Sequence, residues 1–266
     1  MTAWLLGYLA LGAVAGFFAG LLGVGGGAIM VPVLALMFAA QGFSESQLMH
    51  LALGTSMAAI VFTSAASLRA HHAHGAVRWE IVKTIAPGIL IGTFLGAQLA
   101  SAIPTRPLAI FFTVFMSYVA FQLLANVKPK PSRRLPGRFG MFAVGGGIGA
   151  ISALVAIGGG SLSVPFMTWC NVKMHEAIGT SAAIGFPIAA AGTAGYLVGG
   201  WSATALPAGS FGYVYLPALA ACVAASMLAA PLGAKAAHRL PVATLKKIFA
   251  GVILLLLAKM LHELFG

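Results

Sequence analysis

Residues 24–32, which read VGGGAIMVP, interrupt the first 44 residues of the chain, none of which is charged. At 1.5 Å per residue, one helix over that run would be roughly twice as long as the ~30 Å hydrocarbon core of a bilayer. The run therefore has to fold back, and the three consecutive glycines mark the place. We expect a long helix over about 3–22 and a short one over about 28–40.

The composition places this interruption in a membrane protein. Of the 266 residues, 60% are hydrophobic and 7% are charged, whereas soluble domains carry about 25% charged residues. The mean hydropathy is +1.00, so the chain has too little polar surface for a water-soluble enzyme. The 15 Lys and Arg residues outnumber four Glu, and they lie in short loops between apolar runs. That distribution is typical of the positive-inside rule rather than of nucleic-acid binding, and we expect no nucleic-acid partner.

The rest of the chain divides into further apolar runs. They are too long for barrel strands, and none shows the period-2 alternation of a strand. The sequence therefore predicts an all-α integral membrane protein, a helical bundle with short Gly-broken or re-entrant helices. The further runs lie at about 48–68, 84–102, 108–126, 139–156, 160–171, 177–198, 212–234 and 244–261.

Three blocks of sequence occur twice, in the same order, with offsets of 133, 125 and 137 residues. The first is Val24-Gly25-Gly26-Gly27 with Val31-Pro32, repeated as Ile157-Gly158-Gly159-Gly160 with Val164-Pro165; the second is His50 with Gly54-Thr55-Ser56, repeated as His175 with Gly179-Thr180-Ser181; the third is Leu95-Gly96-Ala97 with Ile103-Pro104, repeated as Leu232-Gly233-Ala234 with Leu240-Pro241. The repetition predicts two repeats of five membrane segments, over 1–127 and 139–266. Residues 128–138, with five basic residues and three prolines, form the linker between them.

Charge counting predicts how the repeats are oriented. Loops 69–83, 128–138 and 235–247 carry the Lys and Arg residues of a cytoplasmic side, whereas 41–47 and 199–211 carry none. The loop 101–107, with Arg106 alone, also faces outward. Five segments per half then make the halves inverted and place both termini outside the cytoplasm. Whether the first two segments of each half both cross or form a re-entrant hairpin stays open. Inverted repeats with Gly- or Pro-interrupted helices are typical of secondary transporters.

The duplicated blocks supply the candidate binding residues. A helix that starts just after a glycine triplet points unpaired N–H groups and the positive end of its dipole at the break, and such an end binds anions. Close helix packing is the alternative role for the glycines, and hydrogen bonds to their own helix the alternative for the hydroxyls. The histidines could instead be interfacial. The candidate substrate-binding residues are Gly25, Gly26, Gly27, Thr55, Ser56, Gly158, Gly159, Gly160, Ser161, Thr180, Ser181, His50 and His175.

The positions of the acidic residues indicate the charge of the substrate. All four glutamates lie near segment ends, so no carboxylate is expected in mid-membrane, which favours an anionic or neutral substrate over a cation. The chain contains no nucleophile elbow, no zinc motif and no nucleotide-binding loop. We therefore expect no cofactor, no metal, no catalytic residue and no ATP-driven step. A coupling ion, proton or sodium, and a homodimer are both left open.

The ordered blocks resemble the TauE/SafE family, also called the toluene sulfonate uptake permease family. The residues that carry the resemblance are Gly16 to Leu34, His50 to Ser56, His74-Gly75 with Val77 and Trp79, Gly158 to Pro165, Leu206-Pro207, Gly212-Tyr213-Val214 and Pro217-Ala218. The resemblance implies a multi-pass permease of the prokaryotic cytoplasmic (inner) membrane. It also implies sulfite or organosulfonates such as sulfoacetate as substrates, often exported.

Two other functions compete with a permease. One is an anion channel, and the other is a metal-dependent intramembrane enzyme with His50 and His175 as ligands. The bilayer and a small anionic substrate are the partners that we expect.

Overall fold

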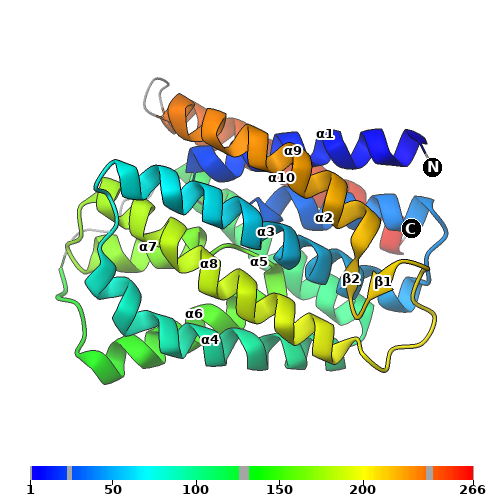
Figure 1. The fold of residues 1–266 in the computed structure, drawn as a ribbon, viewed down its shortest axis with the longest axis horizontal. Helices are drawn as coiled ribbons and strands as arrows, with labels where there is room; N and C mark the ends of the chain where they lie inside the picture. The colour runs from blue at the N-terminus through cyan, green and yellow to red at the C-terminus, as the bar shows by residue number, and fades with distance from the viewer. Residues whose placement is uncertain (1, 23–25, 126–131, 238–241, 266) are drawn as a thin grey trace.

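The computed structural model describes residues 2–22, 26–125, 132–237 and 242–265, which are nearly all helical (Figure 1). The first half contains α1 (Thr2–Leu22), α2 (Gly27–Ala40), the 3₁₀ turn η1 (Glu45–Gln47), α3 (Leu48–Ala73), α4 (Trp79–Ala102) and α5 (Thr105–Ala125). The second contains α6 (Arg138–Val155), α7 (Gly160–Trp169), α8 (Met174–Gly199), β1 (Ser210–Phe211), β2 (Val214–Tyr215), α9 (Leu216–Ala237) and α10 (Val242–Phe265). The predicted all-α membrane class is confirmed.

Helix lengths separate spanning from broken segments. Within the described residues, seven helices (α1, α3, α4, α5, α6, α8 and α9) are long and apolar enough to cross a bilayer. By contrast, α2 has 14 residues and α7 has 10, which gives lengths of about 21 and 15 Å. Neither can cross ~30 Å of hydrocarbon alone. Both short helices therefore begin inside the bundle, at the glycine triplets.

Each half packs its first and fourth helices against helices of the other half, which we call helix exchange. The first helix of each half packs along the fourth helix of the other, so that α1 contacts α9 and α4 contacts α6. These two pairs flank the central pair α3 and α8, which run in opposite directions (Figure 1). The element order of the halves matches, but the inverted orientation and the division at 128–138 stay predictions. Residues 128–131 lie outside the described part of the chain.

Small residues bring the exchanged helices into close contact. A Cβ atom on Gly16 of α1 would lie 2.6 Å from the Ser226 carbonyl oxygen of α9, and one on Gly92 of α4 would overlap the Gly146 carbonyl of α6. Larger side chains there would separate the backbones, which is the usual reason for small residues at membrane helix interfaces. Packing is therefore the role of these glycines.

A β-hairpin with two residues in each strand replaces the start of one predicted helix. The run 212–234 was expected to be helical throughout, yet Ser210 pairs with Tyr215 and Phe211 with Val214 in antiparallel strands. The helix begins only at Leu216. The expectation of no strand was therefore wrong here. The tight turn is possible because Gly212 adopts a φ of 52°, a left-handed conformation that glycine tolerates.

Candidate functional site

The Gly-Thr pair of α3 holds the hairpin against the bundle. Gly54 lies so close to Tyr213 that a Cβ atom would overlap the Tyr213 carbonyl oxygen. The neighbouring Thr55 is fully buried, and its Oγ1 accepts a hydrogen bond of 3.0 Å from the backbone N–H of Tyr215. Tyr215 is the residue before α9, so Thr55 fixes where that helix starts.

The Gly-Thr pair of α8 makes the matching contacts in the other half. A Cβ atom on Gly179 would lie 2.6 Å from the Ala76 carbonyl oxygen. The buried Thr180 Oγ1 accepts a 2.9 Å hydrogen bond from the backbone N–H of Arg78, the residue before α4. The two pairs thus do the same structural work in their two halves. A ligand contact by Thr55 or Thr180 stays a prediction.

These matched contacts show which residues of α3 and α8 are equivalent. Equivalent residues lie 125 positions apart, which is the offset of the duplicated sequence block. Because the start of α3 meets the hairpin after α8, while the start of α8 meets the loop after α3, the two helices are antiparallel. Their Gly-Thr pairs therefore lie toward opposite ends of the bundle.

The two candidate histidines occupy different environments. His50 is 3% exposed, stacks on Tyr213 with ring centroids 4.9 Å apart, and places Nε2 3.0 Å from the Ile103 carbonyl oxygen. Burial raises the pKa of the Tyr213 phenol, so the stacked ring is neutral. His175 is exposed at the start of α8. Ala76 stands at the position equivalent to Tyr213, so His175 lacks the matching aromatic ring.

Their separation argues against a shared metal site. His50 and His175 each lie at the start of a 26-residue helix, and the two helices run in opposite directions. An α-helix of that length extends about 39 Å. The geometry therefore removes the metal-ligand pair that the enzyme alternative requires.

Both short helices begin at a glycine in the left-handed conformation. Gly26 caps α2 with φ 74°, and Gly159 caps α7 with φ 75°. Neither helix has a side-chain cap at this end. The predicted breaks thus lie at the triplets, although Gly25 falls outside the described residues. Gly27, the first residue of α2, packs so tightly that a Cβ atom would overlap the carbonyl oxygen of Ala156, the C-cap of α6.

Hydroxyl groups follow the triplet in the second half. Ser163 of α7 donates a 3.0 Å hydrogen bond to Ser181 of α8, which ties the first turn of α7 to α8. Gly160 opens that turn, and the oxygen of Ser161 is buried without a hydrogen-bond partner in the described part of the chain. The first half differs, because Ser56 has no such partner and the apolar Met30 stands where α7 has Ser163.

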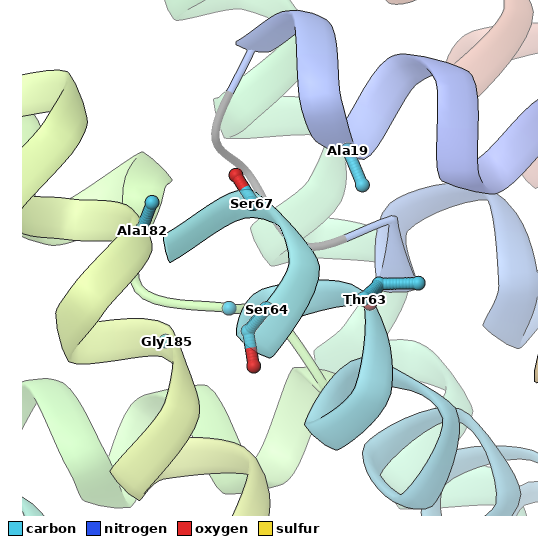
Figure 2. Close-up of a pocket in the computed structure, with 7 residues that line it drawn as sticks. Ala19, Thr63, Ser64, Ser67, Ala182 and Gly185 are labelled. Atoms are coloured by element: carbon cyan, nitrogen blue, oxygen red, sulfur yellow. The ribbon is translucent and has the colours of Figure 1, made fainter. Parts of the chain in front are cut away.

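A small pocket lies beside the second triplet (Figure 2). It has an empty volume of about 220 Å³, but the part wide enough for a water molecule holds only about one. Residues 63–67 of α3 and 182–185 of α8 form two of its walls, and α1 and the α6–α7 turn close the others. The lining residues are Ala19, Thr63, Ser64, Ser67, Gly158, Ala182 and Gly185.

The pocket is polar without being charged. Thr63 and Ser64 donate hydrogen bonds to carbonyls of their own helix. The oxygen of Ser67, a residue that is 6% exposed, has no partner among the described residues. No described residue in the lining is charged. Ser67 is thus able to donate a hydrogen bond to a bound molecule, and the described lining offers no charged side chain to pair with one.

Sequence reasoning found only part of this pocket. Gly158 is the predicted residue that lines it, whereas Thr63, Ser64 and Ser67 were missed. Three hydroxyls within five residues, in the middle of a membrane helix, are the signal that could have found them. Ala182 and Gly185 carry no sequence signal, since alanine and glycine are common throughout the chain.

A wider hollow opens at another place, between η1 and the start of α5. Its empty volume is about 1,320 Å³, part of which is open solvent. Glu45, Thr105 and Arg106 lie on its rim. Both chain termini lie at the same end of the bundle as this loop region (Figure 1). The hollow is a candidate vestibule at the end away from the basic loop 69–83.

Comparisons with known proteins agree with a transport role. The family model described as "Sulfite exporter TauE/SafE" matches residues 8–260. A probable membrane transporter protein of Haemophilus influenzae is 37% identical over 94% of this chain and 95% of its own length. The probable membrane transporter protein YdhB of Bacillus subtilis is 25% identical over 90% and 96% of the two chains. No solved structure gives a significant match.

Proposed function

The chain belongs to the sulfite exporter TauE/SafE family, and we propose that this multi-pass membrane protein carries small sulfur-containing anions such as sulfite or organosulfonates. The substrate binds in the pocket between α3, α8 and the α6–α7 turn. The observation that carries the proposal is the position of this hydroxyl-lined pocket, beside a helix break within a membrane bundle. Broken helices usually line the substrate site of secondary transporters.

The start of α7 supports binding of an anion. Gly158 lines the pocket and directly precedes Gly159, the N-cap of α7. In the first turn of α7 the N–H groups of Gly160 and Leu162 already donate hydrogen bonds to backbone carbonyls. The attraction for negative charge therefore comes from the positive end of the helix dipole, and it costs no buried lysine or arginine. The Ser163–Ser181 hydrogen bond holds this end of α7 against α8, next to Ala182. Ser67 completes the set with its hydroxyl donor.

The positions of the carboxylates disfavour a cation as substrate. Glu45 and Glu80 are exposed, and Glu176 pairs with Arg78 at the start of α8. None of these three lines the pocket. A cation inside the membrane would need such a group as its counter-charge.

A carrier fits the pocket better than a channel does. A channel requires a continuous wet path, whereas this pocket admits about one water molecule. Transport through it requires the pocket to widen and then to open toward one side. The helices of the two halves would move against each other in that step. Export across the inner membrane, with the basic loops in the cytoplasm and a proton or sodium gradient as driving force, belongs to the same proposal.

Flux into proteoliposomes tests the proposal. Radiolabelled sulfite and sulfoacetate are offered to purified protein, and we expect saturable uptake with counterflow. Imposed proton and sodium gradients identify the coupling ion. Flux that rises linearly with concentration and lacks counterflow would establish the channel instead. A protein that moves neither anion would contradict the proposed substrate class.

One substitution tests the site itself. Ser67→Ala removes the unpartnered hydroxyl, and a hydrogen bond to an anion contributes about 1.5–3 kcal/mol. We therefore expect the half-saturating concentration to rise about tenfold or more. Ser101→Ala is the matched control, because that hydroxyl donates only to a carbonyl of its own helix. Equal flux parameters for the two variants would remove the pocket from the mechanism.

A further inference from the structure

We propose that Ala182 and Gly185 set the upper size limit of the transported anion, and that the repeat provides this site on one side of the molecule only. The inference rests on the proposed function, because it takes the pocket beside Gly158 as the substrate site. It assigns a selective role to two residues that carry no functional group.

The equivalence of residues in α3 and α8 identifies the place in the other half that corresponds to the pocket. With the offset of 125 that the Gly-Thr pairs define, Met57 of α3 corresponds to Ala182 of α8, and Ile60 corresponds to Gly185. In the same register Ser67 corresponds to Gly192. We call the set Met57, Ile60, Ile188 and Gly192 the mate position of the pocket.

Larger side chains fill the mate position. The Met57 sulfur lies 3.0 Å from the place of a Cβ atom on Gly192, so the methionine occupies the space that stays open between Ala182 and Ser67. The Ile60 Cδ1 atom lies 3.1 Å from the place of a Cβ atom on Gly27. Met57 and Ile60 are both completely buried. Among the described residues, the space that forms the pocket on one side is therefore packed on the other.

Small residues keep the pocket open on the α8 side. A Cβ atom on Gly185 would point at the pocket wall, 3.1 Å from the Gly158 carbonyl oxygen and 3.6 Å from Ser64 Cβ. A methyl group fits there after a shift of a few tenths of an ångström, but it takes space from the guest. Ala182 faces the same space, where the longer side chain of Met57 fills the mate position.

This geometry makes selectivity depend on volume. All described lining groups are neutral, so charge in the lining does not distinguish between anions of the same charge. A compact inorganic oxyanion needs little widening of the pocket, whereas an organosulfonate must also place its carbon chain. One methylene group in a fitted pocket changes discrimination by about 10- to 200-fold.

The test compares sulfite and sulfoacetate flux in wild-type protein, Gly185→Ala and Ala182→Met, at a pH where both anions are dianions and differ in size alone. We expect Gly185→Ala to lower the sulfoacetate-to-sulfite ratio of kcat/KM by about tenfold, and Ala182→Met to abolish both fluxes. Gly192→Ala is the matched control, because the three atoms nearest to the same methyl group there belong to the flexible thioether of Met57. Its ratio should stay within about twofold of wild type. Should wild type carry only one of the anions, the same ratio is measured on a series of anions that it carries.

Folding is checked in parallel by size-exclusion profile and melting temperature. If Ala182→Met does not fold, the smaller substitution Ala182→Val replaces it, and loss of the sulfoacetate flux is expected. An unchanged ratio in folded Gly185→Ala overturns the size limit while leaving the transporter intact. Absence of flux in wild type overturns the proposed function instead. An equal change in Gly192→Ala would also overturn the inference, since the effect would then be unrelated to the pocket.

Discussion

The pocket and its mate position share one backbone plan but differ in what fills them. Both lie where α3 crosses α8 beside the start of a short helix, and both are framed by the same Gly-Thr contacts. One contains three hydroxyls and open space, whereas Met57 and Ile60 fill the other. The difference shows that the backbone contacts define the frame of the fold, while a few side-chain volumes decide which side can hold a guest.

The short helices differ in the same sense. The first residues of α7 include Ser161 and Ser163, but the corresponding residues of α2 are Ala28 and Met30. An anion at the start of α2 would therefore meet apolar side chains, and the backbone there already contacts Ala156. In the described lining, the side-chain hydroxyls of the pocket thus all come from α3, and the second half contributes Gly158, Ala182 and Gly185.

The largest expected effect is a loss of stability from a substitution at the tightly packed start of α2. Gly27→Ala places a methyl group on the Ala156 carbonyl oxygen, where backbone meets backbone. We expect the folded protein to be lost, with a cost of about 3 kcal/mol or more. Gly147→Ala is the control, because its Cβ atom meets nothing within 4 Å. Size-exclusion profiles and thermal unfolding in detergent measure both. A stable Gly27→Ala variant would show that the first break has room for a guest after all.

Opening the mate position is expected to have the second largest effect. Met57→Ala removes a completely buried side chain beside Gly192, and such truncations cost about 2–5 kcal/mol of unfolding free energy. Met227→Ala, at a site that is 43% exposed, should change it by no more than about 0.5 kcal/mol. Because Gly192 stands where the pocket has Ser67, the new cavity lacks that hydroxyl, and we expect that adding Met57→Ala does not restore flux to Ala182→Met. Restored flux would mean that volume alone makes a site.

The smallest expected effect is a pair of stability losses that tests whether the two Gly-Thr contacts are equivalent. Thr55→Val and Thr180→Val each leave one backbone N–H without its acceptor, which costs about 1–3 kcal/mol. We expect the two losses to agree within about 0.5 kcal/mol, since both threonines do the same work. Thr193→Val, whose hydroxyl bonds only its own helix, controls for the substitution itself. Unequal losses in denaturation experiments would break the equivalence.

Composition and glycine spacing were enough to predict the fold class and the helix breaks. The long apolar runs have few solutions in a bilayer, and Gly26 and Gly159 cap the short helices where the triplets indicated. The hairpin was missed because residues 212–215 carry no charge and no proline and run directly into the apolar helix that follows. Its fold depends on Thr55, which lies 160 positions from Tyr215 in the sequence.

The site was harder to predict than the fold. Duplicated motifs suggested duplicated environments, yet His50 stacks on Tyr213 while the equivalent residue beside His175 is Ala76. The pocket exists because Ala182 and Gly185, opposite Ser64 and Ser67, have a small side chain or none. Only the antiparallel register of two helices in space brings these residues together.

The exchange of helices between the halves has a consequence for biogenesis. During synthesis, α1 enters the membrane long before α9, its partner in the folded protein, which begins at Leu216. Until then the close-packing face that contains Gly16 remains uncovered. A truncated or stalled chain would therefore display this face in the bilayer, where it is a structural mark by which quality-control proteases could distinguish unfinished molecules from complete ones.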